Sequence, residues 1–163
     1  MPEVERVGLG YDLHRLAAGR RLVLAGVVID WPEGLVGHSD ADVALHALID
    51  AVLGAAGLGD IGEAFPDTDP TYKDVDSGEL TRQAADMAAR AGWRVVNADL
   101  TIRAERPRLS GYKQAMRDRI AELLGVEPGQ VNVKAKTDEG TGPVGSGDAM
   151  AAMAIVGLAK LRP

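Results

Sequence analysis

The sequence predicts a single-domain α/β fold, in which strands and helices follow one another along the chain. Residues 93–103 alternate apolar and polar side chains with the period of two that is typical of a half-buried strand, and residues 43–53 carry apolar side chains at helical spacing. The chain has 163 residues, of which 46% are hydrophobic and 26% charged, and no linker, charge block or repeat divides it. We therefore expect one domain over residues 1–163 with a sizeable core.

The N-terminal part is predicted to contain a strand followed by a hairpin. Residues 4–9 form the strand, which leads into Asp12 and His14 at its end. Since these two residues are two positions apart, they point to the same side of an extended chain. Residues 21–24 and 27–29 flank an Ala-Gly pair and predict a short hairpin.

A helix is predicted over residues 43–53. Asp42, His46 and Asp50 recur every four residues, so they are expected to share one polar face of this helix. The other faces are apolar and can be buried. Candidates for the residues at its two ends are Ser39 or Asp40 and Gly54 or Gly57.

The next segment is predicted to be a loop and a second helix. Residues 59–70 carry three aspartates around a Phe-Pro pair, namely Asp60, Asp67 and Asp69. Surface-turn chemistry explains such aspartates as well as a binding role does. Asp76 and Glu79 are spaced as a capping box, which predicts a helix from there to about Ala91.

Strands and a helix also alternate in the second half of the chain. Residues 93–103 are expected to form an interior strand. Residues 106–109 connect it to a helix over residues 110–124, which Gly125 ends. Residues 131–136 alternate again and predict another strand.

A glycine-rich loop and an ambiguous segment complete the chain. The spacing Gly140-x-Gly142-x-x-Gly145 formally matches a nucleotide-binding pattern, but no acidic residue can follow about 20 residues later, as that pattern requires. What remains is a flexible loop whose backbone amides can approach phosphate closely. In residues 149–161, alanine and methionine favour a helix by propensity.

Composition excludes several classes of function. The chain has no cysteine, which excludes disulfides and thiolate metal sites and is compatible with a cytoplasmic location. The first residues, MPEVER, lack the features of a signal peptide, and the longest apolar run, residues 149–159, is shorter than the roughly 20 residues of a membrane span. A net charge of −6 argues against nucleic-acid binding, whereas an anionic small substrate would need divalent metals to offset the acidic loops.

Asp12, His14 and His46 form a candidate metal site. One carboxylate and two imidazoles make a three-ligand set, which leaves a fourth zinc position open. Without thiolates, zinc or manganese suits such ligands better than copper or an iron–sulfur cluster. On the helix pattern alone, His46 is more simply interpreted as a surface histidine, and the Asp-x-His pair is what favours a metal.

The sequence also resembles a known enzyme family, the 2-C-methyl-D-erythritol 2,4-cyclodiphosphate synthases. The resemblance rests on DLH at residues 12–14, GHSDADVALHALIDAVLGA at 37–55, GDIGEAFPDTDP at 59–70 and NVKAKTDEG at 132–140. It extends from about residue 7 to 158. It implies a ferredoxin-like mixed sheet with helices mainly on one face, in which residues 149–161 form a strand.

The resemblance further implies a reaction and an assembly. Enzymes of this family convert 4-diphosphocytidyl-2-C-methyl-D-erythritol 2-phosphate to the 2,4-cyclodiphosphate and release CMP. The expected partner is therefore this nucleotide-linked small molecule, with neither nucleic acid nor membrane involved. The family implies a homotrimer with an active site at each subunit interface, one Zn²⁺ per site, and a Mg²⁺ or Mn²⁺ ion on the diphosphate.

Carried over residue by residue, the resemblance assigns site residues along most of the chain. The implied zinc ligands are Asp12, His14 and His46, of which Asp12 and His14 also face the substrate. The phosphate contacts are His38 and Ser39, and the methylerythritol segment comprises Asp60, Ile61, Gly62, Phe65, Pro66, Asp67, Thr68 and Asp69. The cytidine wall, which belongs to the neighbouring subunit, comprises Arg106, Pro107, Arg108, Leu109, Ser110, Ala135 and Lys136. The diphosphate loop comprises Thr137, Asp138 and Glu139, with Glu139 at the second metal, and the implied catalytic residues are His38 and Thr137.

Some positions depart from the family pattern, and two other functions stay open. Many members carry phenylalanine and arginine near Pro143 and Ser146, and a threonine where this chain has Lys136, so substrate contacts from residues 143–146 are not assigned. Asp50 is a candidate acceptor for a zinc-ligand histidine or a plain exposed carboxylate. A zinc-dependent phosphohydrolase and a non-enzymatic trimeric scaffold with a structural zinc are the alternatives.

Overall fold

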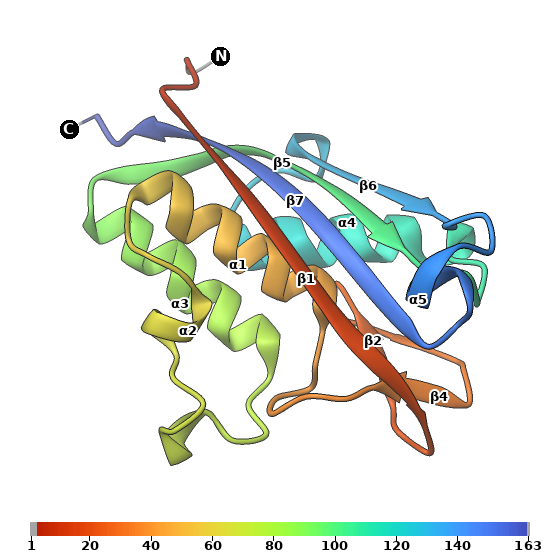
Figure 1. The fold of residues 1–163 in the computed structure, drawn as a ribbon. Helices are drawn as coiled ribbons and strands as arrows, with labels where there is room; N and C mark the ends of the chain where they lie inside the picture. The colour runs from red at the N-terminus through yellow and green to blue at the C-terminus, as the bar shows by residue number, and fades with distance from the viewer. Residues whose placement is uncertain (1–2, 163) are drawn as a thin grey trace.

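The structure is a computed structural model, and it describes residues 3–162. Within these residues the chain forms a five-stranded sheet in the order β4-β1-β7-β5-β6 and a separate two-stranded sheet, β2-β3 (Figure 1). β5 and β6 are parallel, and the other neighbouring pairs are antiparallel, so the main sheet is mixed. The strands are β1 (Arg6–Ala18), β2 (Leu22–Leu24), β3 (Val27–Ile29), β4 (Glu33–Leu35), β5 (Trp93–Arg103), β6 (Val131–Lys136) and β7 (Ala149–Lys160).

Three longer helices cover one face of this sheet. Figure 1 shows α1, α3 and α4 on the same side of the strands, and α1 packs on β1 and β7. The helices are α1 (Val43–Ala56), α2 (Ile61–Ala64), α3 (Ser77–Arg90), α4 (Lys113–Leu124) and α5 (Gly142–Gly145), with 3₁₀ turns η1 (Pro70–Tyr72), η2 (Ser110–Tyr112) and η3 (Pro128–Gln130). The core lies between helices and sheet, and its largest fully buried side chains include Leu45, Leu48, Ile49, Leu53, Leu100, Ile102, Met116, Ile120 and Met150.

Two glycines bring α1 directly onto β1. A Cβ atom at Gly10 would lie 1.7 Å from the carbonyl oxygen of Ala47, and one at Gly8 would lie 2.0 Å from that of Ala51. Both distances are far inside van der Waals contact, so only glycine allows the helix to approach the strand this closely. This approach fixes how near a side chain of α1 lies to the next residues on the same face of β1.

The opposite face of β1 and β7 carries exposed apolar side chains. Leu9 pairs with Ile155 and Tyr11 with Met153 in the register of the two strands. No helix among the described residues covers this part of the sheet in Figure 1. The exposed apolar residues here are Val7, Leu9, Tyr11, Leu13, Met153 and Ile155, of which Leu9 is 67% exposed. Large exposed apolar patches mark interaction surfaces.

Most predicted elements are confirmed. The hairpin, the three longer helices, the strand over residues 93–103 and the strand over 131–136 all form. Residues 149–160 form β7, the centre of the sheet, so the expectation from the family holds and helix propensity misleads there. Burial in a central strand overrides the local preference of alanine and methionine.

Four details of the prediction are wrong or incomplete. β1 continues to Ala18, so Asp12 and His14 lie inside the strand and not at its end. The N-cap of α1 is Asp42, whose side chain accepts from the Leu45 amide, and not Ser39 or Asp40. Asp42 is also fully buried, so the predicted polar face is not solvated along its whole length. The sequence patterns missed β4 and the short helices α2 and α5, of which α5 lies within the predicted glycine-rich loop.

The remaining ends agree with the capping chemistry. Gly57 ends α1 and Gly125 ends α4, both in the left-handed conformation that glycine adopts readily. Asp76 caps α3 by accepting from the Gly78 amide, but the predicted capping box does not form, because the Glu79 side chain accepts from Gln83 instead. Among residues 3–162, no helix is both long and apolar enough to cross a membrane.

Candidate functional site

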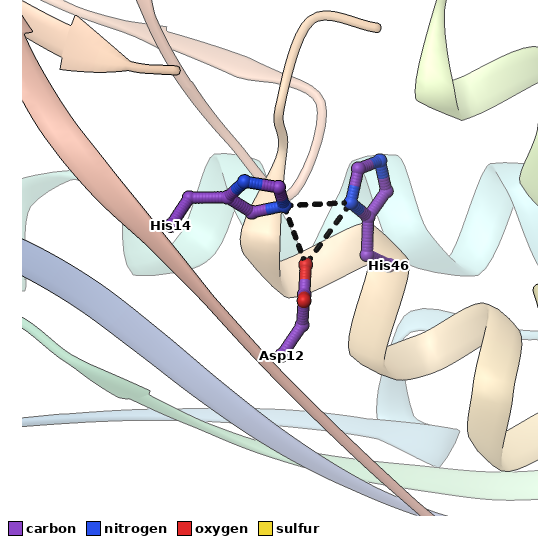
Figure 2. Close-up of side chains that lie close together, drawn as sticks. All are labelled: Asp12, His14 and His46. Atoms are coloured by element: carbon purple, nitrogen blue, oxygen red, sulfur yellow. Dashed lines mark hydrogen bonds and ion pairs between the residues drawn. The ribbon is translucent and has the colours of Figure 1, made fainter. Parts of the chain in front are cut away.

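Asp12, His14 and His46 converge in the structure (Figure 2). β1 supplies Asp12 and His14 from the face that lies against α1, and α1 supplies His46. Oδ2 of Asp12 lies 2.8 Å from Nε2 of His14 and 3.0 Å from Nδ1 of His46. The two ring nitrogens are 3.2 Å apart. All three side chains are partly buried, so the group opens to solvent on one side.

The hydrogen bonds of the outer ring nitrogens fix which nitrogens face the group. Nδ1 of His14 lies 2.8 Å from the carbonyl oxygen of Val36, which can only accept, so Nδ1 carries a hydrogen and Nε2 faces Asp12. Nε2 of His46 lies 3.0 Å from Oγ of Ser77 and 3.1 Å from Oγ of Ser39. Both imidazoles are thus oriented by their second nitrogen, as is usual for metal-binding histidines.

The donor set fits a tetrahedral zinc ion. Zinc–ligand distances of about 2.0–2.1 Å imply separations of roughly 3.3 Å between ligand atoms. The observed separations of 2.8 to 3.2 Å are slightly shorter. Small shifts of the side chains would therefore be enough for Asp12, His14 and His46 to hold such an ion.

The charges of the group are coupled. Burial raises the pKa of Asp12, but hydrogen bonds and charge interactions with His14 and His46 outweigh burial and lower this pKa to about 2. The hydrogen bond from His14 to Asp12 raises the pKa of His14. A carboxylate that stays ionised beside imidazoles attracts a cation, and a bound cation takes the place of the proton.

A pocket of about 220 Å³ adjoins the three residues. Besides the candidate ligands, it brings together six residues of the predicted site, which are His38, Ser39, Ile61, Gly62, Phe65 and Asp67. Tyr72, Val75 and Leu80 also line it, and the sequence analysis did not identify them. Tyr72 packs edge-on against Phe65, with ring centroids 5.4 Å apart. The pocket therefore has an aromatic wall next to the candidate metal centre.

The other predicted residues of this segment do not line the pocket, and they are Asp60, Pro66, Thr68 and Asp69. Asp60 caps α2 by accepting from the Glu63 amide at 2.9 Å, and Asp69 accepts from the Thr71 amide at 2.9 Å. These are the local hydrogen bonds that the turn interpretation describes.

Asp50 does not orient a histidine of the group. Its carboxylate accepts from the Ile61 amide at 2.8 Å and so ties α1 to the start of α2. The outer nitrogen of His46 faces Ser77 and Ser39 instead. The role that the sequence suggested for Asp50 belongs to serine side chains.

A second pocket of about 510 Å³ gathers the predicted cytidine wall. The loop after β5, with a cis peptide bond between Arg106 and Pro107, faces the end of β6 across it. The predicted residues that line it are Arg106, Pro107, Arg108, Leu109, Ser110, Ala135, Lys136 and Thr137. Trp31 and Lys113 line it too, and no pattern in the sequence pointed to them. Cationic side chains around an apolar hollow suit a nucleotide.

The neighbouring loop is held by its own side chains. Asp138 forms a bidentate ion pair with Arg103, which lowers the pKa of Asp138. The Thr137 hydroxyl donates to Glu139 at 3.2 Å. Neither Asp138 nor Glu139 lines the second pocket. Ser146 donates to Asp148 at 2.7 Å, so its hydroxyl is used within the chain.

The two pockets share no lining residue. Within one chain, the structure collects the predicted residues into two groups, one around the candidate metal centre and one around residues 104–110.

The chain is similar to known proteins over most of its length. The family model described as "YgbB family" matches residues 5–159. The chain is 56% identical over 151 residues to 2-C-methyl-D-erythritol 2,4-cyclodiphosphate synthase of Moorella thermoacetica, and this match covers 93% of both chains. Among solved structures, a cyclodiphosphate synthase in a CDP-bound form superimposes with a TM-score of 0.87 at 38% identity, covering 94% of this chain and 99% of the other.

Two further relatives are longer proteins. The chain is 56% identical over 156 residues to the bifunctional enzyme IspD/IspF of Anaeromyxobacter sp. (strain Fw109-5), covering 96% of this chain and 40% of that enzyme. The structure of the bifunctional IspDF from Campylobacter jejuni matches with a TM-score of 0.93 at 43% identity, covering 99% of this chain and 43% of that one. The chain thus spans about two fifths of the bifunctional relatives and nearly all of the shorter ones. Because the family match includes all three candidate ligands and both pockets, the chain belongs to the YgbB family.

Proposed function

We propose that the chain converts 4-diphosphocytidyl-2-C-methyl-D-erythritol 2-phosphate to 2-C-methyl-D-erythritol 2,4-cyclodiphosphate and releases CMP, as a CMP-releasing phosphorus–oxygen lyase of the non-mevalonate isoprenoid pathway. The observation that carries the proposal is the group of Asp12, His14 and His46 beside a pocket that contains His38 and Ser39. A relative named 2-C-methyl-D-erythritol 2,4-cyclodiphosphate synthase, 56% identical over 93% of the chain, supports it. The activity is assigned to one domain over residues 1–163.

Zinc is the metal proposed for the three ligands, and Mg²⁺ or Mn²⁺ is proposed for the diphosphate with Glu139. When bound, these cations supply charge neutralisation for the phosphate groups. Three protein ligands suit a catalytic site better than a closed structural one, which argues against a scaffold that merely keeps a zinc. Glu139 lies in the loop after β6, where its backbone adopts a positive φ of 53°.

The reaction is a direct attack of a 2-phosphate oxygen on the β-phosphorus. The new oxygen–phosphorus bond forms as the bond to the CMP phosphate breaks, and CMP leaves with the electron pair. A phosphate monoester has a second pKa of about 6, so its oxygen is already anionic at neutral pH and needs no general base. The chain's task is to hold two anionic groups together, and such orientation is worth roughly 7 to 11 kcal/mol of barrier.

His38 and Thr137 are the side chains proposed to stabilise charge during the reaction. His38 lines the pocket beside the candidate ligands, and Thr137 lines the other pocket. In this arrangement the methylerythritol lies against Ile61, Gly62 and Phe65. The cytidine lies against residues 106–110, Ala135 and Lys136.

The proposed active unit is a homotrimer with composite sites. Two observations support it: the pockets share no residue, and the exposed apolar face of β1 and β7 is available to bury against other copies. The second pocket of one subunit would complete the first pocket of its neighbour. An inactive His46→Ala variant mixed with an inactive Ala135→Trp variant should then regain partial activity after subunit exchange. Full activity of a monomer in native mass spectrometry would contradict the composite site.

Oxygen labelling separates ring closure from hydrolysis. Ring closure takes no oxygen from solvent, whereas a phosphohydrolase must take one. In ¹⁸O-labelled water, with Zn²⁺ and Mg²⁺ present, we expect unlabelled CMP and an unlabelled cyclic product by mass spectrometry. Label in either product, or a linear product as the main species, would assign the chain to the phosphohydrolases.

A further inference from the structure

Ser77 lies where the imidazole of His46 needs a hydrogen-bond partner. Its hydroxyl oxygen is 3.0 Å from Nε2 of His46, on the side of the ring that faces away from Asp12. Ser77 is the first residue of α3 and is completely buried. No water competes for a hydroxyl at this depth, so the contact persists whenever α3 is in place.

Asp40 determines the direction of that hydrogen bond. The Ser77 hydroxyl donates its one hydrogen to Oδ1 of Asp40, and the Ser77 amide donates to Oδ2 at 3.0 Å. The Asp42 amide also donates to Oδ1 of Asp40, at 3.1 Å. Since its hydrogen is used, the Ser77 oxygen can only accept from His46. An Nε2 that carries a hydrogen leaves Nδ1 of His46, which lies 3.0 Å from Asp12, as the ring nitrogen that would ligate a metal ion.

We propose that Asp40 and Ser77 are positioning residues, which set the tautomer and orientation of His46 as a metal ligand. The inference rests on the zinc centre of the proposed function. It adds to that centre two residues that touch neither metal nor substrate. It also explains how α3 contributes to the site. Through Ser77, this helix hydrogen-bonds to His46, and it directly follows the chain segment that lines the first pocket. Metal binding and the placement of that segment are therefore coupled.

Ser39 is the competing partner of His46, and the structure distinguishes it from Ser77. Oγ of Ser39 lies 3.1 Å from Nε2 of His46 and accepts from the Ala41 amide at 3.2 Å. Ser39 is only partly buried and lines the first pocket, so its hydroxyl can turn toward a ligand. Ser77, held by Asp40 through both amide and hydroxyl, has no such freedom.

Zinc affinity of single variants tests the proposal. In a competition assay with a chromogenic chelator, Ser77→Ala and Asp40→Asn should each weaken zinc binding by about 10- to 100-fold. Thr81→Val is the matched control, because Thr81 is equally buried in α3 and its hydroxyl donates to the Ser77 carbonyl without touching His46. It should bind zinc like the wild type. Thermal unfolding of each metal-free variant shows whether the fold is retained.

A spectroscopic readout separates positioning from a merely structural role. With three histidines in the chain, ¹⁵N–¹H correlation spectra of the rings can be assigned by replacing each in turn. Zinc-loaded wild type should show His46 with its hydrogen on Nε2. In zinc-loaded Ser77→Ala the Nε2–H group of His46 should lose its bond to the buried oxygen, so its hydrogen signal should shift upfield and exchange faster with solvent.

The outcomes separate this inference from the proposed function. If wild type binds zinc and Ser77→Ala binds it equally well with an unchanged Nε2–H signal, the inference is overturned and the proposed function stands. The inference is also overturned if Ser39→Ala, and not Ser77→Ala, weakens binding. If wild type binds no zinc, the zinc centre of the proposed function fails and the inference fails with it.

Discussion

His46 uses one ring nitrogen toward Asp12 and His14 and the other toward the start of α3. Removing its side chain removes one of three ligands, and two ligands do not hold zinc in a protein site of this kind. We expect His46→Ala to lose stoichiometric zinc and turnover while keeping the fold. Elemental analysis of the purified variant measures the zinc.

His38→Ala is the matched control for this variant. His38 lines the same pocket but is not in the ligand group. The His38→Ala variant should retain one zinc per chain. It should lose turnover, because the charge that develops on the phosphates is no longer stabilised by His38. Stoichiometric zinc in His46→Ala would refute the ligand assignment.

Asp42 leads to a prediction about pH. Its buried carboxylate accepts from the amides of Ala25, Gly26 and Leu45. Burial nevertheless raises its pKa from 3.8 to about 6. The folded state therefore binds the proton more tightly than the unfolded chain, and the stability that this gives is complete below about pH 4 and is lost as the pH rises to about 6.

The Asp42→Asn variant isolates this effect. The difference in unfolding free energy between wild type and variant should shrink as the pH rises from 4 to 6.5 and stay constant above that. Urea unfolding at a series of pH values measures it. The side-chain amide of asparagine cannot accept all three hydrogen bonds that the carboxylate accepts, so the variant should be less stable at every pH. A difference that grows with pH would show that the carboxylate is better stabilised as an ion.

The sequence predicted some site residues better than others, for a physical reason. Asp12, His14 and His46 are recognisable because their spacing places them on defined faces of a strand and a helix. Ser77 carries no such signal, since a serine at the first turn of a helix is common for capping reasons alone. Trp31 meets the second pocket only through the tertiary fold. Sequence periodicity cannot identify residues whose role depends on contacts between distant segments of the chain.

At the level of elements, the contact between β1 and α1 determines whether the ligand group can form. Gly10→Ala should destabilise the protein by about 1–3 kcal/mol, because its methyl group would meet the backbone of α1 and the helix must move away. That movement also separates His46 from Asp12, so zinc affinity should fall with stability. Chemical unfolding and chelator competition measure the two effects.

Gly54→Ala is the matched control in the same pair of elements. A Cβ atom at Gly54 meets nothing within 4 Å, and the residue lies inside α1. Alanine is favoured over glycine in a helix, so this variant should gain up to about 1 kcal/mol. If Gly10→Ala is as stable as the wild type, the close approach of helix and strand is not a constraint.

The elements themselves were largely predictable, and their missing details have local causes. Alternation identified β5 and β6, and glycine ends identified the limits of α1 and α4. β4 has three residues, too few for a period to appear. α2 begins at an aspartate cap in a segment rich in turn residues, which favoured a loop. Strand order, with the last strand β7 in the centre, follows from long-range pairing that no local pattern encodes.

At the scale of the whole molecule, the exposed apolar face should control assembly. Leu9 is 67% exposed and pairs with Ile155 on this face. In a trimer that buries this face, Leu9→Lys places a charge at the interface and should yield monomers in analytical ultracentrifugation. Turnover should fall with assembly, while each chain keeps its zinc.

Val28→Lys provides the comparison for this variant. Val28 is 47% exposed but lies on the separate hairpin, away from β1 and β7. It should leave both assembly and turnover unchanged. A Leu9→Lys protein that remains trimeric would show that another surface holds the subunits together.

β1 carries residues of the ligand group on one side and apolar residues of the open face on the other. Gly8, Gly10, Asp12 and His14 lie toward α1, and the residues between them point the opposite way. Because strand alternation couples the two sides, losing or gaining one residue within β1 exchanges them for part of its length. Point substitutions can alter metal binding or subunit contacts separately, but an insertion or deletion here alters both. Insertions and deletions can therefore be tolerated in the loops, whereas the number of residues in β1 between Gly8 and His14 must stay constant.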